Sequence, residues 1–274
     1  MSAAYIPLDV DFIKANLNTS RIGKEIIVYK STSSTNDIAA EYARGGKKND
    51  GLAVFAESQT AGRGRRGNKW QSGEGKSILC SILLYEPDIR PDTLTLAFAV
   101  AAAESIGRCG RNDAKIKWPN DILLNDKKVA GILVEASATK NKKKYYIAGI
   151  GINCHQKKED FSDELSQTAT SIDIQSGGVC DRNRIAKRLL INLDHYVTGG
   201  LENTGEIVEK WRSMSILLGK RITVEHNGRE FTGNCIGIEP IEGLVLQLER
   251  GGVKMFDAAS TTVVKIELTE TSNG

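Results

Sequence analysis

The segment QTAGRGRRGNKWQSGEGKS, residues 59–77, decides how the surrounding chain is organised. It follows the β-patterned run LAVFAES (52–58) and leads into a second such run, SILCSILLY (77–85), so we predict a loop between two strands. Glycines make an empty loop costly to hold in one shape, and arginines offer forked donors that match phosphate oxygens. We therefore expect this loop to be loose alone and ordered around a phosphate ligand. A charged surface loop without a ligand is the alternative.

Three familiar glycine-rich motifs do not explain this loop. GRGRRG (62–67) has the spacing of a dinucleotide-binding fingerprint, but a second strand follows where that motif requires a helix. A P-loop ending at Ser77 would need a glycine at the position of Trp70. A protein-kinase glycine loop would need a valine where Lys69 stands. The sequence therefore indicates a phosphate site of another kind.

Composition excludes several classes of protein. The chain has 274 residues with 40% apolar composition, enough for one large domain or for a large and a small one. Its net charge of +3 is too small for a dedicated nucleic-acid binder, so any polyanion site must be local. With no basic leader and no run near the ~18 apolar residues of a membrane span, we expect a cytoplasmic protein that does not bind membranes.

The five cysteines predict neither a disulfide framework nor a zinc site. They are odd in number, are scattered, and lack C-x-x-C spacing, so we expect reduced thiols. They are Cys80, Cys109, Cys154, Cys180 and Cys235.

Hydrophobic periodicity predicts an α+β chain. We expect helices at 8–17, 35–46, 94–110, 181–199 and 204–219, and strands at 25–31, 52–58, 77–85, 121–125, 129–137 and 144–154. From residue 220 onward, short alternating strands with glycine turns predict a small β-barrel. We place the boundary near residue 218, which gives a domain of residues 1–218 and a second of residues 219–274.

Three further strings are candidates for ligand binding. In KWPND (117–121), Asn120 and Asp121 at a strand edge can reach a ligand or a hydrated Mg²⁺, although a plain turn is the simpler explanation. In YIAGIGIN (146–153), strand alternation puts Gly149, Gly151 and Asn153 on one face, which clears a floor for a ligand unless it marks a bulge or close strand packing. STSSTND (31–37) supplies hydroxyls and an amide, and helix capping explains part of it.

In this order and spacing, the motifs resemble those of the biotin-protein ligase family. The matching strings are Ser34-Thr35-Asn36, Gln59 through Trp70, Lys117 to Asp121, Lys128 with Ala130 to Glu135, and Gly149 to Asn153. The similarity is close over residues 22–155 and looser beyond them. It implies a catalytic domain like that of class II synthetases and lipoate ligases, with a mixed β-sheet flanked by helices, and a small C-terminal SH3-like β-barrel.

The resemblance implies a two-step reaction. The carboxylate of biotin attacks the α-phosphate of Mg²⁺-ATP and gives biotinyl-5′-AMP and pyrophosphate. A specific lysine of a biotin carboxyl carrier domain then attacks the mixed anhydride and releases AMP. Charge builds on phosphate oxygens in the first step, and cations such as Arg65 and Lys128 can meet it.

The resemblance also implies roles for individual residues. The catalytic residues are Lys128 and Arg65. Biotin binding is expected from Ser34, Thr35, Asn36, Gln59, Gly62, Arg63, Arg65, Lys128, Gly131, Leu133, Gly149 and Gly151. ATP and adenylate binding is expected from Arg63, Arg65, Arg66, Trp70, Lys117, Asn120, Asp121, Lys128 and Asn153, with Asp121 as a candidate Mg²⁺ ligand through the phosphates.

Two other readings of the chain stay open at this point. A lipoate-protein ligase of the same superfamily is the nearer one. A nucleic-acid-binding module using the arginine loop and the barrel is the other, and it predicts salt-sensitive binding to generic DNA or RNA. Because only about 30 residues precede Ser34, we expect no DNA-reading domain. A homodimer formed through the central sheet is a further expectation.

Overall fold

A computed structural model describes residues 6–85, 87, 89–107, 113–139, 142–199, 202, 204–239 and 242–267. Cys109 and the end of the helix predicted at 94–110 lie outside these residues. Within them, Cys80, Cys154, Cys180 and Cys235 are free thiols, as expected. No helix of the described residues combines the length and apolarity needed to cross a membrane.

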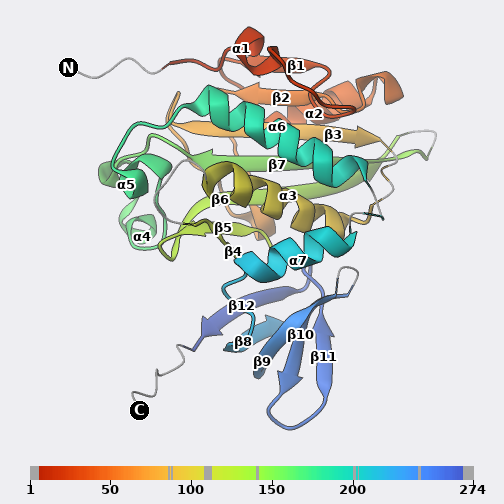
Figure 1. Ribbon diagram of the computed structural model, residues 1–274, viewed down its shortest axis with the longest axis vertical. Coiled ribbons are helices and arrows are strands. Elements are labelled where there is room, and N and C mark those ends of the chain that lie inside the picture. The colour runs from red at the N-terminus through yellow and green to blue at the C-terminus, as the bar shows by residue number, and fades with distance from the viewer. Residues whose placement is uncertain are drawn as a thin grey trace.

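The larger part of the chain is built on a seven-stranded mixed sheet (Figure 1). Its strand order is β1 (Ile26–Tyr29), β2 (Ala53–Ala56), β3 (Ser77–Tyr85), β7 (Lys144–Asn153), β6 (Lys127–Ala138), β5 (Asp121–Leu124) and β4 (Lys115–Lys117). β1 and β2 are parallel, and the other neighbours are antiparallel.

Helices cover both faces of this sheet. In Figure 1, α6 (Arg182–Thr198), α3 (Pro91–Gly107) and α7 (Thr204–Met214) lie in front of it, while α2 (Thr35–Ala43) lies behind. Successive side chains of a strand point to opposite faces, which explains why β2 contributes to both layers. Ala53 and Phe55 pack into the core under α3 and α6, and Val54 packs with Ala39 of α2. α3 is buried along most of its length, as its Ala-rich, nearly uncharged sequence predicts. The short α1 (Val10–Lys14) packs on α6.

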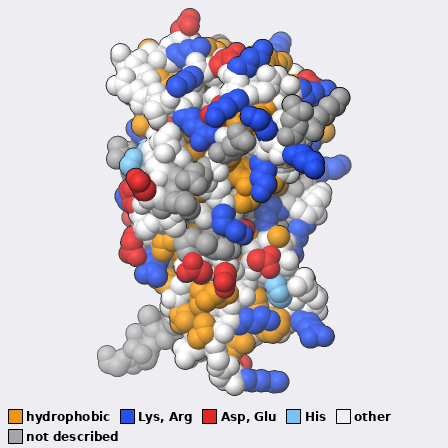
Figure 2. Space-filling model, turned by 90° about the vertical axis from the view of Figure 1, so that its right-hand side faces the viewer, with side chains coloured by type: hydrophobic (Ala, Val, Ile, Leu, Met, Phe, Trp, Pro, Cys, Tyr) orange, Lys and Arg blue, Asp and Glu red, His pale blue; other side chains and the backbone are white. Residues whose placement is uncertain are grey.

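Residues beyond Lys220 form a separate five-stranded antiparallel sheet, drawn at the bottom of Figure 1. Its order is β11 (Val253–Phe256), β10 (Gly243–Leu248), β9 (Arg229–Glu239), β8 (Arg221–His226) and β12 (Thr261–Ile266). Several of its apolar side chains are exposed, and Figure 2 shows hydrophobic side chains gathered at this end of the molecule. The α+β class with a small C-terminal β unit is confirmed, and the boundary near residue 218 stays a prediction.

Some predicted boundaries were wrong for local reasons. The strand predicted at 121–125 ends at Leu124 because Asn125 and Asp126 take positive φ values of 48° and 60°, which close a tight turn into β6. The helix predicted at 204–219 ends at Met214, and Ser215 then pairs with Ile116 beside β4. Two short helices, α4 (Asp163–Ser166) and α5 (Ile172–Ser176), were not predicted because neither has a full period of apolar residues.

Candidate active site

A cavity of about 230 Å³ lies against the α2 side of the large sheet, over β6 and β7. All the site residues predicted from the sequence line it, except Gly62 and Asn153. The predicted residues that line it are Ser34, Thr35, Asn36, Gln59, Arg63, Arg65, Arg66, Trp70, Lys117, Asn120, Asp121, Lys128, Gly131, Leu133, Gly149 and Gly151. Five separate stretches of the sequence, 34–36, 59–70, 117–121, 128–133 and 149–151, therefore converge on one place.

Glycines form the floor of this cavity. Gly131 pairs with Gly151, and Leu133 pairs with Gly149, across the β6–β7 ladder. A Cβ atom at Gly149 would lie 2.5 Å from Asn36 Oδ1, and one at Gly151 would lie 2.3 Å from Trp70 Cε2. Both positions thus require glycine because other side chains approach the strand closely.

Uncharged polar groups surround the Gly149 side of the floor. Gln59 Oε1 accepts hydrogen bonds from Thr35 N at 2.7 Å and from Thr35 Oγ1 at 2.9 Å. Ser81 of β3 donates to Thr35 Oγ1 at 2.7 Å, and Ser81 Oγ lies 2.5 Å from Asn36 Oδ1. Ser34 is the N-cap residue of α2, but its side chain makes no capping hydrogen bond, so capping does not explain its hydroxyl. The result is a buried polar cluster of hydroxyls and amides.

The arginine-rich loop is a closed hairpin. Gly64 N donates to Asn68 O at 2.7 Å, and Trp70 N donates to Gly62 O at 3.0 Å. Between them, η2 (Arg65–Gly67) turns the chain, with Arg66 at a φ of 55°. These main-chain bonds hold the hairpin closed, and its predicted ordering by a ligand stays a prediction.

Two arginines of this loop reach the C-terminal sheet. Arg65 donates to the main-chain oxygen of Ala258, and Arg66 donates to Thr262 Oγ1 of β12. Arg65 also donates to Asn120 Oδ1 at 3.2 Å. Burial, followed by the nearby charge of Arg66, lowers the pKa of Arg65. The surroundings therefore disfavour this cation, and a bound anion would offset that cost.

Lys128 and Asp121 face each other across β5 and β6. Their Nζ and Oδ1 atoms are 2.6 Å apart, and Lys128 Nζ lies 5.8 Å from the centroid of the Trp70 ring. Asn120 is held beside them by a bond of 2.8 Å from its Nδ2 to Ile132 O. These groups surround the Gly131 side of the floor, since Asp121 pairs with Gly131.

The charges that line the cavity are strongly unbalanced. Among its described lining residues, Asp121 is the one carboxylate, and the cations are Arg63, Arg65, Arg66, Lys69, Lys117 and Lys128. Figure 2 shows Lys and Arg side chains spread over one side of the molecule, with hydrophobic side chains between them. A cavity with this excess of positive charge suits a ligand with several negative charges.

Three predicted residues already have partners within the protein, and their ligand-binding roles stay predictions. Arg63 is engaged by carboxylates, with Asp37 at 2.8 Å and Glu135 at 3.4 Å. The Asn153 side-chain amide bonds to other residues of the protein: it donates to Thr170 O at 3.0 Å and accepts from Gln156 Nε2 at 3.0 Å. Gly62 supports the loop, because a Cβ there would lie 2.5 Å from Trp70 O.

Trp70 covers the glycine floor. Its indole lies against Gly131 and Gly151, where a Cβ would meet it at 3.1 Å and 2.3 Å, respectively. Its Nε1 is buried and has no hydrogen-bond partner among the described residues. A buried donor without a partner costs free energy, so the site offers this group to a ligand or moves it when a ligand enters.

Sequence reasoning missed two groups of lining residues. Leu79 of β3 lines the cavity, and Ser81, two residues further along the strand, bonds to Thr35, so strand alternation could have placed both on the cavity face. Thr262 and Val263 come from β12. No local pattern marks these two, because their place depends on how the C-terminal sheet sits against the large one.

The chain is similar to known proteins over most of its length. A family model described as the biotin/lipoate A/B protein ligase family matches residues 28–153. The bifunctional ligase/repressor BirA of Bacillus spizizenii is 36% identical over 253 residues, which cover 90% of this chain and 76% of that protein. This chain belongs to the biotin/lipoate protein ligase family. The biotin–[acetyl-CoA-carboxylase] ligase of Mycobacterium tuberculosis is 29% identical over 94% of this chain and 93% of its own.

Solved structures of this family have the same fold. A variant of the biotin protein ligase of Aquifex aeolicus in complex with biotin gives a TM-score of 0.76 at 27% identity. The same ligase in complex with biotin and ATP gives a TM-score of 0.72 at 28% identity. Each alignment covers 88% of this chain and 98% of the Aquifex chain.

Proposed function

We propose that this chain is an ATP-dependent biotin protein ligase, which forms biotinyl-5′-AMP and transfers biotin to a lysine of a biotin carboxyl carrier domain. The observation that carries the proposal is the order of groups along one glycine floor. Hydroxyls and amides surround Gly149, where Arg63 is already paired with Asp37 and Glu135, and Lys128 lies against Gly131, the partner of Gly151. The zone at Gly149 and the zone at Gly151 are two residues apart along the strand, which is about 7 Å.

This order matches a ligand that is neutral and polar at one end and anionic at the other. The ureido ring of biotin needs hydrogen-bond donors and acceptors without net charge, which Ser34, Thr35 and Gln59 supply. The biotin carboxylate and the phosphates of ATP need cations, which Arg65, Arg66 and Lys128 supply. The first step brings that carboxylate to the α-phosphorus, and pyrophosphate leaves.

Lys128 is the residue we assign to the developing charge. Its ammonium lies beside the floor and is held by the Asp121 carboxylate at 2.6 Å. A fixed cation there stabilises negative charge on the α-phosphate oxygens without reorganising during the reaction. Arg65, a half-buried cation whose two hydrogen-bond partners are neutral, is placed to bind a phosphate oxygen and to hold the loop over the adenylate.

Mg²⁺ fits the donor set only in part. Mg²⁺ is usually bound through one or two carboxylates together with substrate phosphates, and Asp121 with the neighbouring Asn120 can contribute oxygen atoms. Because Asp121 already pairs with Lys128, most of the ligands would come from ATP. When bound, the ion would neutralise phosphate charge.

The C-terminal sheet and a second copy of the chain complete the proposal. Domains of residues 1–218 and 219–274 would close over the adenylate through Arg65, Arg66 and Thr262. A homodimer and a cytoplasmic location also belong to the proposed function.

The deciding experiment is mass spectrometry of a purified carrier domain after incubation with the chain, ATP, Mg²⁺ and biotin. The proposal predicts one biotin mass on one lysine, with none when that lysine is replaced by arginine. A parallel reaction with lipoate serves as the control. Modification by lipoate and none by biotin would contradict the proposal.

A further inference from the structure

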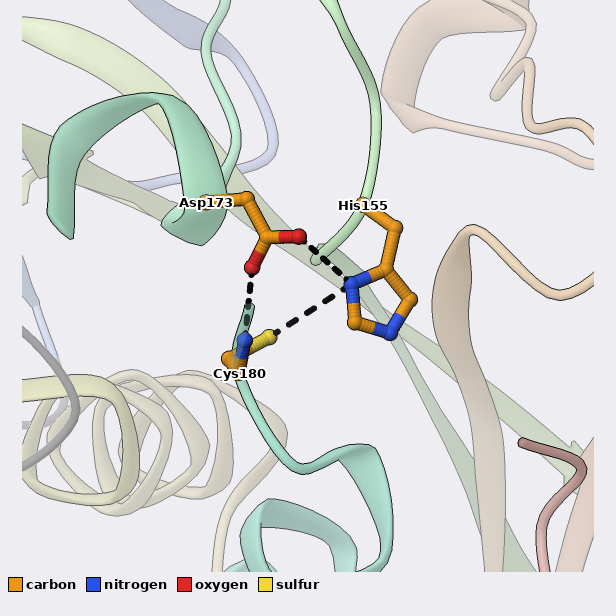
Figure 3. A group of neighbouring side chains, drawn as sticks. All are labelled: His155, Asp173 and Cys180. Atoms are coloured by element: carbon orange, nitrogen blue, oxygen red, sulfur yellow. Dashed lines mark hydrogen bonds and ion pairs between the residues drawn. The ribbon is translucent and has the colours of Figure 1, made fainter. Parts of the chain in front are cut away.

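Three side chains of different chemistry meet beyond the end of β7, outside the cavity (Figure 3). They are His155, Asp173 of α5, and Cys180, which comes just before α6. One imidazole nitrogen, a carboxylate oxygen and the sulfur atom all lie within 4.8 Å of one another. The His155 and Asp173 side chains are 19% and 20% exposed, so a small solute can reach them.

The arrangement is not that of a nucleophilic thiol. A thiol activated by histidine needs the sulfur at one ring nitrogen and the orienting carboxylate at the other. Here both partners face the same atom: His155 Nδ1 lies 2.7 Å from Asp173 Oδ2 and 4.0 Å from Cys180 Sγ. One nitrogen cannot donate to the carboxylate and accept the thiol proton together. What the three groups share is a common point that all of them face (Figure 3).

We propose that His155, Asp173 and Cys180 form a binding site for a divalent transition metal of the zinc type. Imidazole, carboxylate and thiolate are the three kinds of ligand that zinc takes, and three protein ligands leave a fourth position for water. The proposal concerns a site separate from the glycine floor, and it does not depend on the ligase activity.

The distances suit such an ion after small side-chain movements. Zinc at its usual bond lengths holds tetrahedral N, O and S ligands roughly 3.4–3.6 Å apart. The observed separations of 2.7 Å and 4.0 Å lie on either side of that range. The three atoms lie within 4.8 Å of one another, so binding would open the His155–Asp173 pair and draw the sulfur toward both, by about 1 Å.

Main-chain bonds already hold the ligands in place. Cys180 N donates to Asp173 Oδ1 at 2.8 Å, which orients the carboxylate as an outer-shell partner does in metal sites. Asp173 N donates to Cys154 O at 3.0 Å, and His155 N donates to Lys76 O at 2.9 Å. An ion would therefore tie the turn after β7, α5 and the segment before α6 together.

The sequence gives no sign of this site. Its ligands are 18 and 25 residues apart from His155, and no C-x-x-C pair accompanies them. Only the turn after β7 and the short α5 bring them together.

The test uses the purified full chain, stripped of metal and kept reduced by a phosphine. We expect one Zn²⁺ per chain in competition with a chromophoric chelator, and a rise in unfolding temperature on binding. With Co²⁺, we expect a thiolate-to-cobalt charge-transfer band. Cys180→Ala should weaken Zn²⁺ binding by more than about 100-fold and remove the band, since even outer-shell partners are worth about 10- to 100-fold. Asp173→Asn should weaken binding and keep the band.

His195→Gln is the matched control. His195 also has a carboxylate partner, Glu206, at 3.2 Å, and it lies on the surface of α6. This variant should bind Zn²⁺ as the parent does. The proposal is overturned if the parent does not compete for Zn²⁺, if Cys180→Ala binds as tightly as the parent, or if Co²⁺ gives no charge-transfer band. Unfolding of metal-free Cys180→Ala at the same temperature as the metal-free parent would show that its loss of binding is local.

Discussion

Arg65 donates a hydrogen bond to the main-chain oxygen of Ala258, 193 positions further along the chain. The arginine-rich loop of the large sheet is thereby attached to the C-terminal sheet, directly beside the cavity. An acyl adenylate is lost when water reaches it, so a loop whose tip is attached beside the cavity can protect it. The attachment should govern how long the intermediate stays in the site.

Arg65→Gly should make the enzyme leak its intermediate. The substitution removes a half-buried cation and its bonds to Asn120 and Ala258, so we expect faster release of biotinyl-AMP and labelling of lysines on unrelated proteins. Mass spectrometry of a bystander protein measures this. Arg250→Gly, in an exposed turn, is the control. Selectivity equal to that of the parent would remove Arg65 from the proposed role.

Thr262→Val should loosen the same cover more gently. The hydroxyl accepts a bond from Arg66, and valine keeps the shape without the acceptor. We expect hydrolysis of the adenylate in the absence of carrier to rise roughly 2- to 10-fold, the value of one modest hydrogen bond. AMP release per biotin consumed is the measurement. Thr232→Val, which loses a bond of 2.9 Å to Thr223 within the C-terminal sheet, should behave as the parent.

Lys128→Ala should separate the chemical step from binding. We expect adenylate formation, followed by pyrophosphate release, to fall by about 100- to 1,000-fold. Biotin binding measured by calorimetry without ATP should fall much less, because the ureido contacts remain. The control is Lys127→Ala, whose ammonium reaches Ser166 O at 3.4 Å and not the cavity. An equal loss of binding and rate in Lys128→Ala would contradict the assignment.

Gly151→Ala should block the floor. Its new Cβ would lie 2.3 Å from Trp70 Cε2, so the indole must move into the space that the ligand needs. Overpacking of this kind costs about 1–3 kcal/mol, which corresponds to a loss of biotin affinity of roughly 5- to 150-fold. Calorimetry measures the affinity, and tryptophan fluorescence should report the moved indole. At Gly178, where a Cβ would meet nothing within 4 Å in the described part of the chain, the same change should have no effect on binding.

The glycine floor was predictable from the sequence, whereas the contacts of Arg63 and Thr262 were not. Strand alternation placed Gly149 and Gly151 on one face, because the period of a strand is fixed by the backbone alone. The engagement of Arg63 by Asp37 and Glu135 was not predictable, since α2 and β6 meet only in the fold. Thr262 was missed for the same reason. Local patterns thus predicted most of the elements and most of the residues that line the cavity, and contacts between distant elements had to come from the structure.

A buried ion pair should control the stability of the large sheet. Arg182 Nη1 lies 2.7 Å from Glu57 Oε2, and the two side chains are 1% and 4% exposed. Arg182 also donates to Ser77 O at 3.0 Å and to Ile6 O at 2.7 Å, which joins α6 to both ends of the arginine-rich loop region and to the N-terminal segment. Arg182→Met would leave the Glu57 carboxylate buried without its cation, at a cost of about 3–5 kcal/mol in the free energy of unfolding. Urea unfolding followed by circular dichroism measures it.

Arg184→Met is the control: it removes an exposed pair with Asp181 at 3.2 Å and should cost no more than about 1 kcal/mol. Equal losses in the two variants would mean that burial does not set the contribution of the Arg182–Glu57 pair.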